Sequence, residues 1–144
     1  GIVDKYLGDG FIALFGAPVS STWDADNAIS AALEMQNALP RVDDYFVKEI
    51  GASVKIGISI HTGEVVVGNF GFDMKMDYTV IGDSVNIVFR MQGLTRSFPN
   101  GILISENTSK AARSHLEARE VDIKDSNKGI LKGLKIYELL GQNR

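Results

Sequence analysis

The chain has 144 residues, of which 44% are hydrophobic and 23% charged, a composition that fits one globular domain with a real core. Its net charge of −3 gives no reason to expect a nucleic-acid partner, because such binding usually shows as a basic patch. The absence of cysteine excludes disulfides and thiolate metal sites, and it is compatible with a cytoplasmic location.

The first sixteen residues predict a β-hairpin. Two short apolar runs, Ile2–Val3 and Phe11–Phe15, flank the tripeptide Gly8-Asp9-Gly10. Because glycine accepts positive φ and aspartate tolerates it, the tripeptide favours a tight turn, with Asp9 at the tip and Lys5 on one strand. A carboxylate on a tight turn suits a hard cation such as Mg²⁺. Taken alone, the stretch favours a simple turn role for Asp9.

The chain begins at Gly1 rather than at a methionine, and it begins inside this motif. We therefore expect a piece of a longer polypeptide, with regulatory domains or a membrane attachment outside it. Within the chain, no apolar run approaches the roughly 18 residues of a membrane span.

A long helical pattern follows the hairpin. Apolar residues recur at three- and four-residue spacing at Ala28, Ala31, Ala32, Met35 and Leu39. The pattern predicts an amphipathic helix with Asp24 or Asp26 as its N-cap. Pro40 is expected to end or kink this helix, and a second helical piece is predicted over Val42–Ile50, closed by Gly51.

Residues 54–60 predict a strand because apolar and polar residues alternate there. A turn at 62–64 and a returning strand at Val65–Val67 should follow. Gly57, Gly63 and Gly68 mark places where backbone must lie close to something, either packed structure or a ligand. His61 is expected to be a hydrogen-bonded surface residue rather than a catalyst.

Residues 77–90 hold a second motif. A loop or hairpin arm over 70–76 should lead to a short strand at Asp77–Ile81, and Gly82-Asp83-Ser84 predicts a helix start, with Asp83 or Ser84 as the cap. Val85, Val88 and Phe89 are expected to face the core. Asn86 and Arg90 are four residues apart and share another face, which is either solvated or a ligand surface.

The remaining chain mixes short strands and helices. Strands are predicted at 102–105, 121–124 and 134–140, a helix at 106–113, and a mobile loop at 125–133. Neighbouring strands joined by turns indicate the α+β class.

Four motifs now occur in order over about 90 residues: Lys5-x-x-Gly8-Asp9, Gly63-Glu64-x-x-x-Gly68-Asn69, the run from Asp77 to Asn86, and Arg90. In order and spacing they resemble the class III nucleotidyl cyclases, most closely the adenylate cyclase catalytic domains of bacteria and cyanobacteria. The resemblance extends from residue 1 to about Leu140. It implies a single catalytic domain over 1–144 with a ferredoxin-like βαββαβ core and a C-terminal extension, lacking its first strand and helices.

The resemblance also implies roles for five residues. Asp9 matches a metal-binding aspartate, and Lys5 with Thr79 matches the pair that reads adenine. Asn86 matches the residue that orients the ribose, and Arg90 matches the arginine that stabilises charge at the α-phosphate. The implied reaction converts ATP to 3′,5′-cyclic AMP and pyrophosphate, with two divalent cations, Mg²⁺ or Mn²⁺, at the interface of a homodimer.

Three points depart from the family pattern or stay open. The family's second metal-binding aspartate lies upstream of Gly1, so this chain cannot complete a two-metal site and is expected to have little activity alone. The lysine that contacts the β- and γ-phosphates is not evident, and Lys128 or Lys132 could replace it. The alternatives to an adenylate cyclase are a guanylate cyclase and a silent cyclase-like dimerisation or regulatory module.

Overall fold

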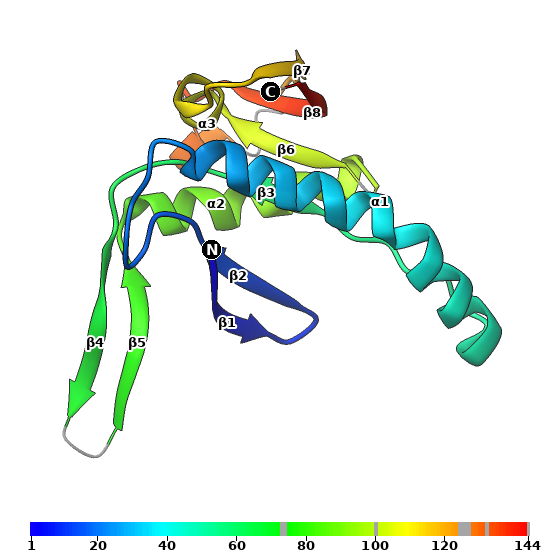
Figure 1. Ribbon diagram of the computed structural model, residues 1–144, viewed down its shortest axis with the longest axis horizontal. Coiled ribbons are helices and arrows are strands. Elements are labelled where there is room, and N and C mark those ends of the chain that lie inside the picture. Colours follow the sequence, from blue (N-terminus) through cyan, green and yellow to red (C-terminus); the bar gives the residue numbers. More distant parts are fainter. Residues whose placement is uncertain (73–74, 100, 124–127, 132, 144) are drawn as a thin grey trace.

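The computed structural model describes residues 1–72, 75–99, 101–123, 128–131 and 133–143, and for 69–72, 75–79, 128 and 130 it describes only the backbone. Its body is a four-stranded sheet (Figure 1). The strand order is β3 (Ile58–Ile60), β6 (Ile102–Ser105), β8 (Ile136–Asn143) and β7 (His115–Glu120). β3 and β6 run parallel, whereas the other pairs are antiparallel. The predicted mixed α and β class is confirmed.

Two hairpins lie outside this sheet. β1 (Ile2–Leu7) pairs with β2 (Gly10–Leu14), and β4 (Val66–Phe72) pairs with β5 (Lys75–Ile81). The predicted strand after the turn at 62–64 is present as β4. It does not return along β3, however, because it pairs with β5 in a separate hairpin. The prediction of a hairpin arm before Ile81 is confirmed, and Figure 1 shows it projecting from the body.

The long helix α1 (Asp24–Ile50) runs unbroken through Pro40 and ends at Gly51, whose φ is 69°. Of the two predicted effects of Pro40, an end of the helix or a kink, the end is wrong. The segment after the helix binds its second half: the Asp43 carboxylate accepts hydrogen bonds from Ser53 Oγ (2.8 Å) and Val54 N (2.6 Å). Such tertiary contacts offset the hydrogen bond that proline removes.

Neither predicted N-cap serves α1, whose first flanking residue is Trp23. Asp24 instead binds the preceding loop, and the hydrogen bond from the Ser21 N–H holds the pKa of Asp24 below its ordinary value. Asp26 is fully buried and accepts hydrogen bonds from the backbone N–H groups of Arg113 and Ser114. This buried carboxylate ties the start of α1 to the chain between α3 and β7.

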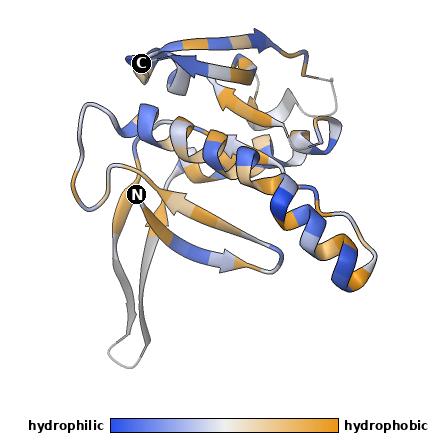
Figure 2. Ribbon diagram, turned by 45° about the vertical axis from the view of Figure 1, so that its right-hand side comes forward, coloured by the Kyte–Doolittle hydropathy of each residue, from blue (hydrophilic) through white to orange (hydrophobic). Residues whose placement is uncertain are grey.

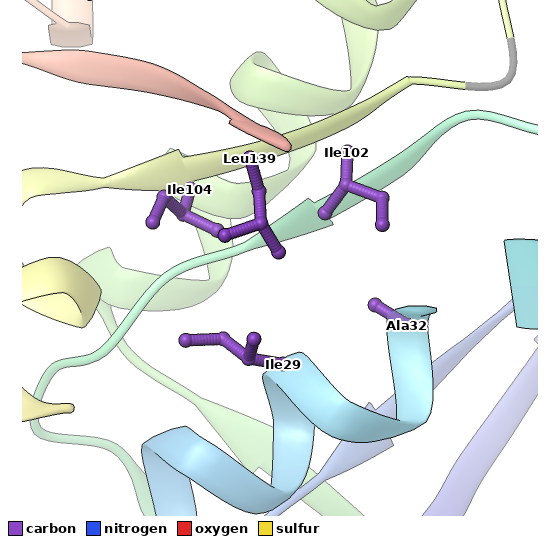
Figure 3. Close-up of a cluster of buried hydrophobic side chains, with 5 residues drawn as sticks. All are labelled: Ile29, Ala32, Ile102, Ile104 and Leu139. Carbon is purple, nitrogen blue, oxygen red and sulfur yellow. The ribbon is translucent and has the colours of Figure 1, made fainter. Parts of the chain in front are cut away.

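The core lies on both faces of β6, where all four residues are buried. On one face, side chains from α1 point toward those of β6 and β8 (Figure 3): Ile29, Ala32, Ile102, Ile104 and Leu139. The other face packs against α2 (Asp83–Leu94) and α4 (Lys128–Leu131) through Met91, Leu103, Leu131 and Ile136. The sheet is therefore sandwiched between α1 and α2, and Figure 2 shows apolar and polar residues alternating along α1.

Several predicted boundaries are wrong. A short 3₁₀ turn, η1 (Thr95–Ser97), follows α2, and α3 spans Glu106–Ala111. The strand expected at 121–124 lies earlier, as β7, because it pairs with β8 along residues 115–120. The loop expected at 125–133 contains α4, and part of it lies outside the described residues. The strand expected over 54–60 is shorter and comprises only Ile58–Ile60, as β3. Among the described helices, none is long and apolar enough to cross a membrane.

Candidate functional site

The β1–β2 hairpin presents Lys5 and Asp9 as the sequence predicts. Lys5 lies on β1 opposite Ile12, just after a bulge, and its side chain is exposed. Asp9 is in the two-residue turn, next to Gly8 with φ of 58°, and it is also exposed. A two-residue turn with a left-handed glycine matches the twist of an antiparallel pair, so the tip is locally determined.

Thr79 lies on β5, where its backbone is opposite Gly68 on β4. β5 contacts both β1 and α2, so it stands between the strand that carries Lys5 and the helix that carries Asn86 and Arg90. The chain passes directly from Ile81 through Gly82 into α2. Gly82 has φ of 151°, and neither Asp83 nor Ser84 caps the helix with its side chain, contrary to prediction.

Asn86 and Arg90 are exposed on α2, one turn apart. Phe89, predicted to face the core, is 48% exposed instead, because the buried side of the helix is centred on Met91. An exposed aromatic beside two exposed polar side chains indicates a surface suited to contact rather than to core packing.

The two candidate phosphate-binding lysines are less well defined. Lys128 is the first residue of α4, and α4 packs against α2 through Leu131 and Met91. The backbone at Lys128 therefore belongs to the same side of the sheet as Arg90. Lys132 lies outside the described residues.

The predicted site residues lie on neighbouring elements and on the tip of one hairpin. β5 contacts both β1 and α2, so the strand that carries Thr79 adjoins the strand of Lys5 and the helix of Asn86 and Arg90. The tip of the β1–β2 hairpin, which holds Asp9, points away from the β4–β5 hairpin in both Figure 1 and Figure 2. Asp9 therefore lies at a hairpin tip that is directed away from the hairpin of Thr79.

The acidic residues do not form a complete metal site. Among the residues whose side chains are described, no three His, Asp or Glu side chains cluster closely enough to hold an ion. Asp9 could supply one oxygen ligand, but Mg²⁺ in near-octahedral geometry needs more. A two-metal centre therefore requires ligands that this part of the chain does not bring together.

Sequence reasoning missed Asp4. Both of its carboxylate oxygens are buried, and neither has a hydrogen-bond partner in the described part of the chain. The register of β1 shifts between Val3 and Lys5, so Asp4 sits at the bulge next to the predicted base-reading lysine. The one sequence signal for Asp4 is a charged residue within an apolar run. The alternation of apolar and polar residues does not predict which face of the hairpin a bulged residue occupies.

His61 is hydrogen-bonded, as predicted, but it is half buried rather than on the surface. Its Nδ1 lies 2.8 Å from Ser105 Oγ, and burial lowers the pKa of the imidazole. Ser105 also accepts a hydrogen bond from Thr108 N and so caps α3. His61 therefore links the end of β3 to the start of α3, which is a structural role.

The fold and these motifs define a class of protein, and comparison with known families agrees. Residues 4–141 match the family described as the adenylate and guanylate cyclase catalytic domain. The chain belongs to this family.

Among known proteins, the chain is 36% identical over 145 residues to an adenylate cyclase of Anabaena cylindrica. That match covers 96% of this chain but only 28% of the relative. An adenylate cyclase specific to terminal differentiation in Dictyostelium discoideum is 31% identical over the whole chain, which spans 7% of that relative. The chain therefore corresponds to a small part of these longer proteins.

Solved structures give the same family with both nucleotide preferences. The crystal structure of the guanylyl cyclase Cya2 is similar with a TM-score of 0.80 and 35% identity, covering all of this chain and 72% of that one. The adenylyl cyclase CyaB from P. aeruginosa is similar with a TM-score of 0.79 and 28% identity, covering all of this chain and 74% of that one.

Proposed function

We propose that this domain is an adenylate cyclase, a phosphorus–oxygen lyase that converts ATP to 3′,5′-cyclic AMP and pyrophosphate. The observation that supports the proposal is that β5, the strand of Thr79, contacts both β1, the strand of Lys5, and α2, the helix of Asn86 and Arg90. In such a reaction the 3′-hydroxyl attacks the α-phosphorus and pyrophosphate leaves, so catalysis depends on positioning and charge stabilisation.

The base preference follows from donor and acceptor chemistry. The Lys5 ammonium can donate to adenine N1, and the Thr79 hydroxyl can accept from adenine N6. Guanine presents the opposite pattern at these positions, and a lysine would then face a donor. The relation to the guanylyl cyclase Cya2 favours guanylate cyclase as the second candidate.

Asn86 and Arg90 would act on the ribose and the phosphate. Because they lie one turn apart on an exposed face of α2, a nucleotide along that face meets both. Asn86 would orient the ribose, and Arg90 would stabilise the negative charge that develops at the α-phosphate. Lys128 or Lys132 would contact the outer phosphates.

A homodimer would bring Asp9, at the tip of the β1–β2 hairpin, to a site on the partner. In a two-fold dimer, Asp9 of one protomer would serve the site that its partner builds from Lys5, Thr79, Asn86 and Arg90. The exposed apolar side chains of the β1–β2 hairpin, among them Tyr6, Leu7 and Phe11, support a contact surface there. The family uses divalent metal ions, and Asp9 would hold one of them together with carboxylates outside the described chain.

The base preference is tested by kinetics on the full-length protein. A site built to hydrogen-bond adenine should reject GTP by about 10²-fold or more in kcat/KM. Replacing Lys5 with Glu and Thr79 with Cys should shift the preference toward GTP. Equal kcat/KM for the two nucleotides in the wild-type protein would contradict the adenylate cyclase proposal.

The shared site is tested by complementation. Arg90→Ala should lower kcat by about 10²–10³-fold, with a much smaller change in KM, because the arginine acts mainly in the transition state. Mixing inactive Arg90→Ala and Asp9→Ala proteins should restore about a quarter of wild-type activity, since half the dimers are mixed and each has one intact site. If mixed dimers form and stay inactive, Asp9 and Arg90 do not serve one site from different protomers, and the shared-site proposal is wrong.

A further inference from the structure

The helix that carries Asn86 and Arg90 rests on the segment around β3 with almost no space between them. A methyl group at Gly57 would lie 2.3 Å from Thr95 Oγ1 and 2.6 Å from Thr95 Cβ. A methyl group at Gly63 would lie 2.1 Å from Ser84 Oγ and 3.1 Å from Ser84 Cβ. Thr95 directly follows α2 and Ser84 is in its first turn, so the two glycines contact opposite ends of the helix.

Hydrogen bonds hold the same helix between these two points. Ser59 Oγ lies 3.2 Å from the Val88 carbonyl and 2.9 Å from Gln92 Oε1. Gln92 Nε2 in turn donates to the Gly57 carbonyl at 2.9 Å. The anchored side of α2 thus includes Val88 and Gln92, which are on either side of Arg90 in the sequence.

The residue that precedes α2, Gly82, is also closely packed against the chain after Gly63. A methyl group at Gly82 would lie 3.3 Å from the Glu64 carbonyl oxygen and 3.5 Å from Val65 Cα. The chain just after Gly63 therefore touches the residue that opens the helix. Two of the motifs in the sequence, around Gly63 and around Gly82, are in direct contact.

We propose that Gly57 and Gly63 are positioning residues for the cyclisation reaction: their missing side chains let α2 approach β3, and this approach fixes where Asn86 and Arg90 lie. The inference rests on the proposed function. Neither glycine has a φ that requires glycine, so space rather than backbone conformation explains the residue type at both positions. A displacement of about 1 Å at a positioned group can cost on the order of 10²-fold in rate.

The two contacts differ in how a larger residue could be accommodated. At Gly63 the nearest atom is a hydroxyl oxygen that can rotate away, which leaves the 3.1 Å contact with Ser84 Cβ and the looser 3.4 Å contact with His61 Nε2. At Gly57 the nearest atoms include Thr95 Cβ, which moves only with the backbone, and Thr95 is 6% exposed. Gly57→Ala should therefore move α2 further than Gly63→Ala.

The test compares three alanine variants of the full-length protein. We expect Gly57→Ala to lower kcat by about 10- to 100-fold and Gly63→Ala by about 3- to 10-fold, with KM changed by less than about threefold in both. Gly93→Ala is the matched control, because Gly93 is on α2 and a methyl group there would meet nothing within 4 Å. It should leave kcat unchanged.

A compensating change separates positioning from general stability. Thr95→Gly should lower the melting temperature, because it removes the hydroxyl that donates to the Gln92 carbonyl at 2.6 Å, but it should keep kcat within about threefold of wild type. Combined with Gly57→Ala, it should restore most of the lost kcat while stability stays low. Recovery of rate without recovery of stability is not expected of a merely structural contact.

The inference is overturned if Gly57→Ala, or Gly63→Ala should the first variant not fold, keeps wild-type kcat in a folded protein while Arg90→Ala loses activity. If Arg90→Ala also keeps its activity, the proposed function fails instead, so the two failures are distinguishable.

Discussion

The four-stranded sheet and the two hairpins differ in how well their apolar side chains are covered. Every residue of β6 is buried between α1 and α2, whereas the β1–β2 hairpin exposes Tyr6 at 80% and Phe11 at 44%. A two-stranded hairpin is marginally stable alone, so these elements depend on the body or on another chain. The body therefore supplies stability and anchors α2, while the hairpins carry Lys5, Asp9 and Thr79.

The largest expected effect tests whether the β1–β2 hairpin contributes to catalysis but little to the stability of the fold. Asp9→Ala in the full-length protein should reduce turnover by at least about 10²-fold, because a lost metal ligand removes several kcal/mol of transition-state stabilisation. The melting temperature should not change, since Asp9 is exposed in a turn. Asp44→Ala, an exposed acid on α1, is the control and should keep full activity. Turnover within tenfold of wild type would remove Asp9 from the proposed site.

The converse prediction places stability in the body. Ile104→Ala should lower the free energy of unfolding by about 2–4 kcal/mol, because it leaves a cavity in the fully buried cluster of Figure 3. Tyr6→Ala on the hairpin should cost less than about 1 kcal/mol, mainly through its contact with the Phe11 ring. Urea denaturation measures both. Similar losses for the two variants would show that the hairpin is as integral to the fold as the sheet.

A smaller effect, of opposite sign, is expected at Asp4. Replacing this buried carboxylate by an apolar side chain of similar size removes two unpartnered oxygens, so Asp4→Val should raise the free energy of unfolding by about 1 kcal/mol. Asp122→Val, at an exposed position, should change it by less than about 0.5 kcal/mol. Destabilisation by Asp4→Val would mean that a donor from outside the described chain satisfies this carboxylate.

The smallest expected effect is a pH dependence in the body. Burial lowers the pKa of His61 from its ordinary value of 6.5, so below that pH the unfolded chain takes up the proton first. The folded state should lose stability as the pH falls from 6.5 toward the lower pKa of folded His61, and His61→Gln should remove this part of the dependence. His115→Gln, at the exposed histidine, is the control. The same slope in both variants would assign the dependence to other groups.

Features that depend on local chemistry could be predicted from the sequence alone. The β1–β2 turn at Gly8 and Asp9 forms where it was predicted, because a glycine with positive φ is a local requirement of a two-residue turn. The strand at Ile102–Ser105 and the helix after Gly82 also follow from local pattern, and motif spacing was enough to identify the family.

Other features depend on contacts between elements of the folded chain. α1 continues through Pro40 because of contacts such as those of Asp43 with Ser53 and Val54, and β4 pairs with β5 rather than with β3. The sequence is compatible with either a packing or a ligand role for Gly57 and Gly63. The folded chain places them against Thr95 and Ser84 and so favours packing. The neighbour of a glycine and the partner of a strand depend on contacts that form only when the chain folds, and local propensity carries no information about them.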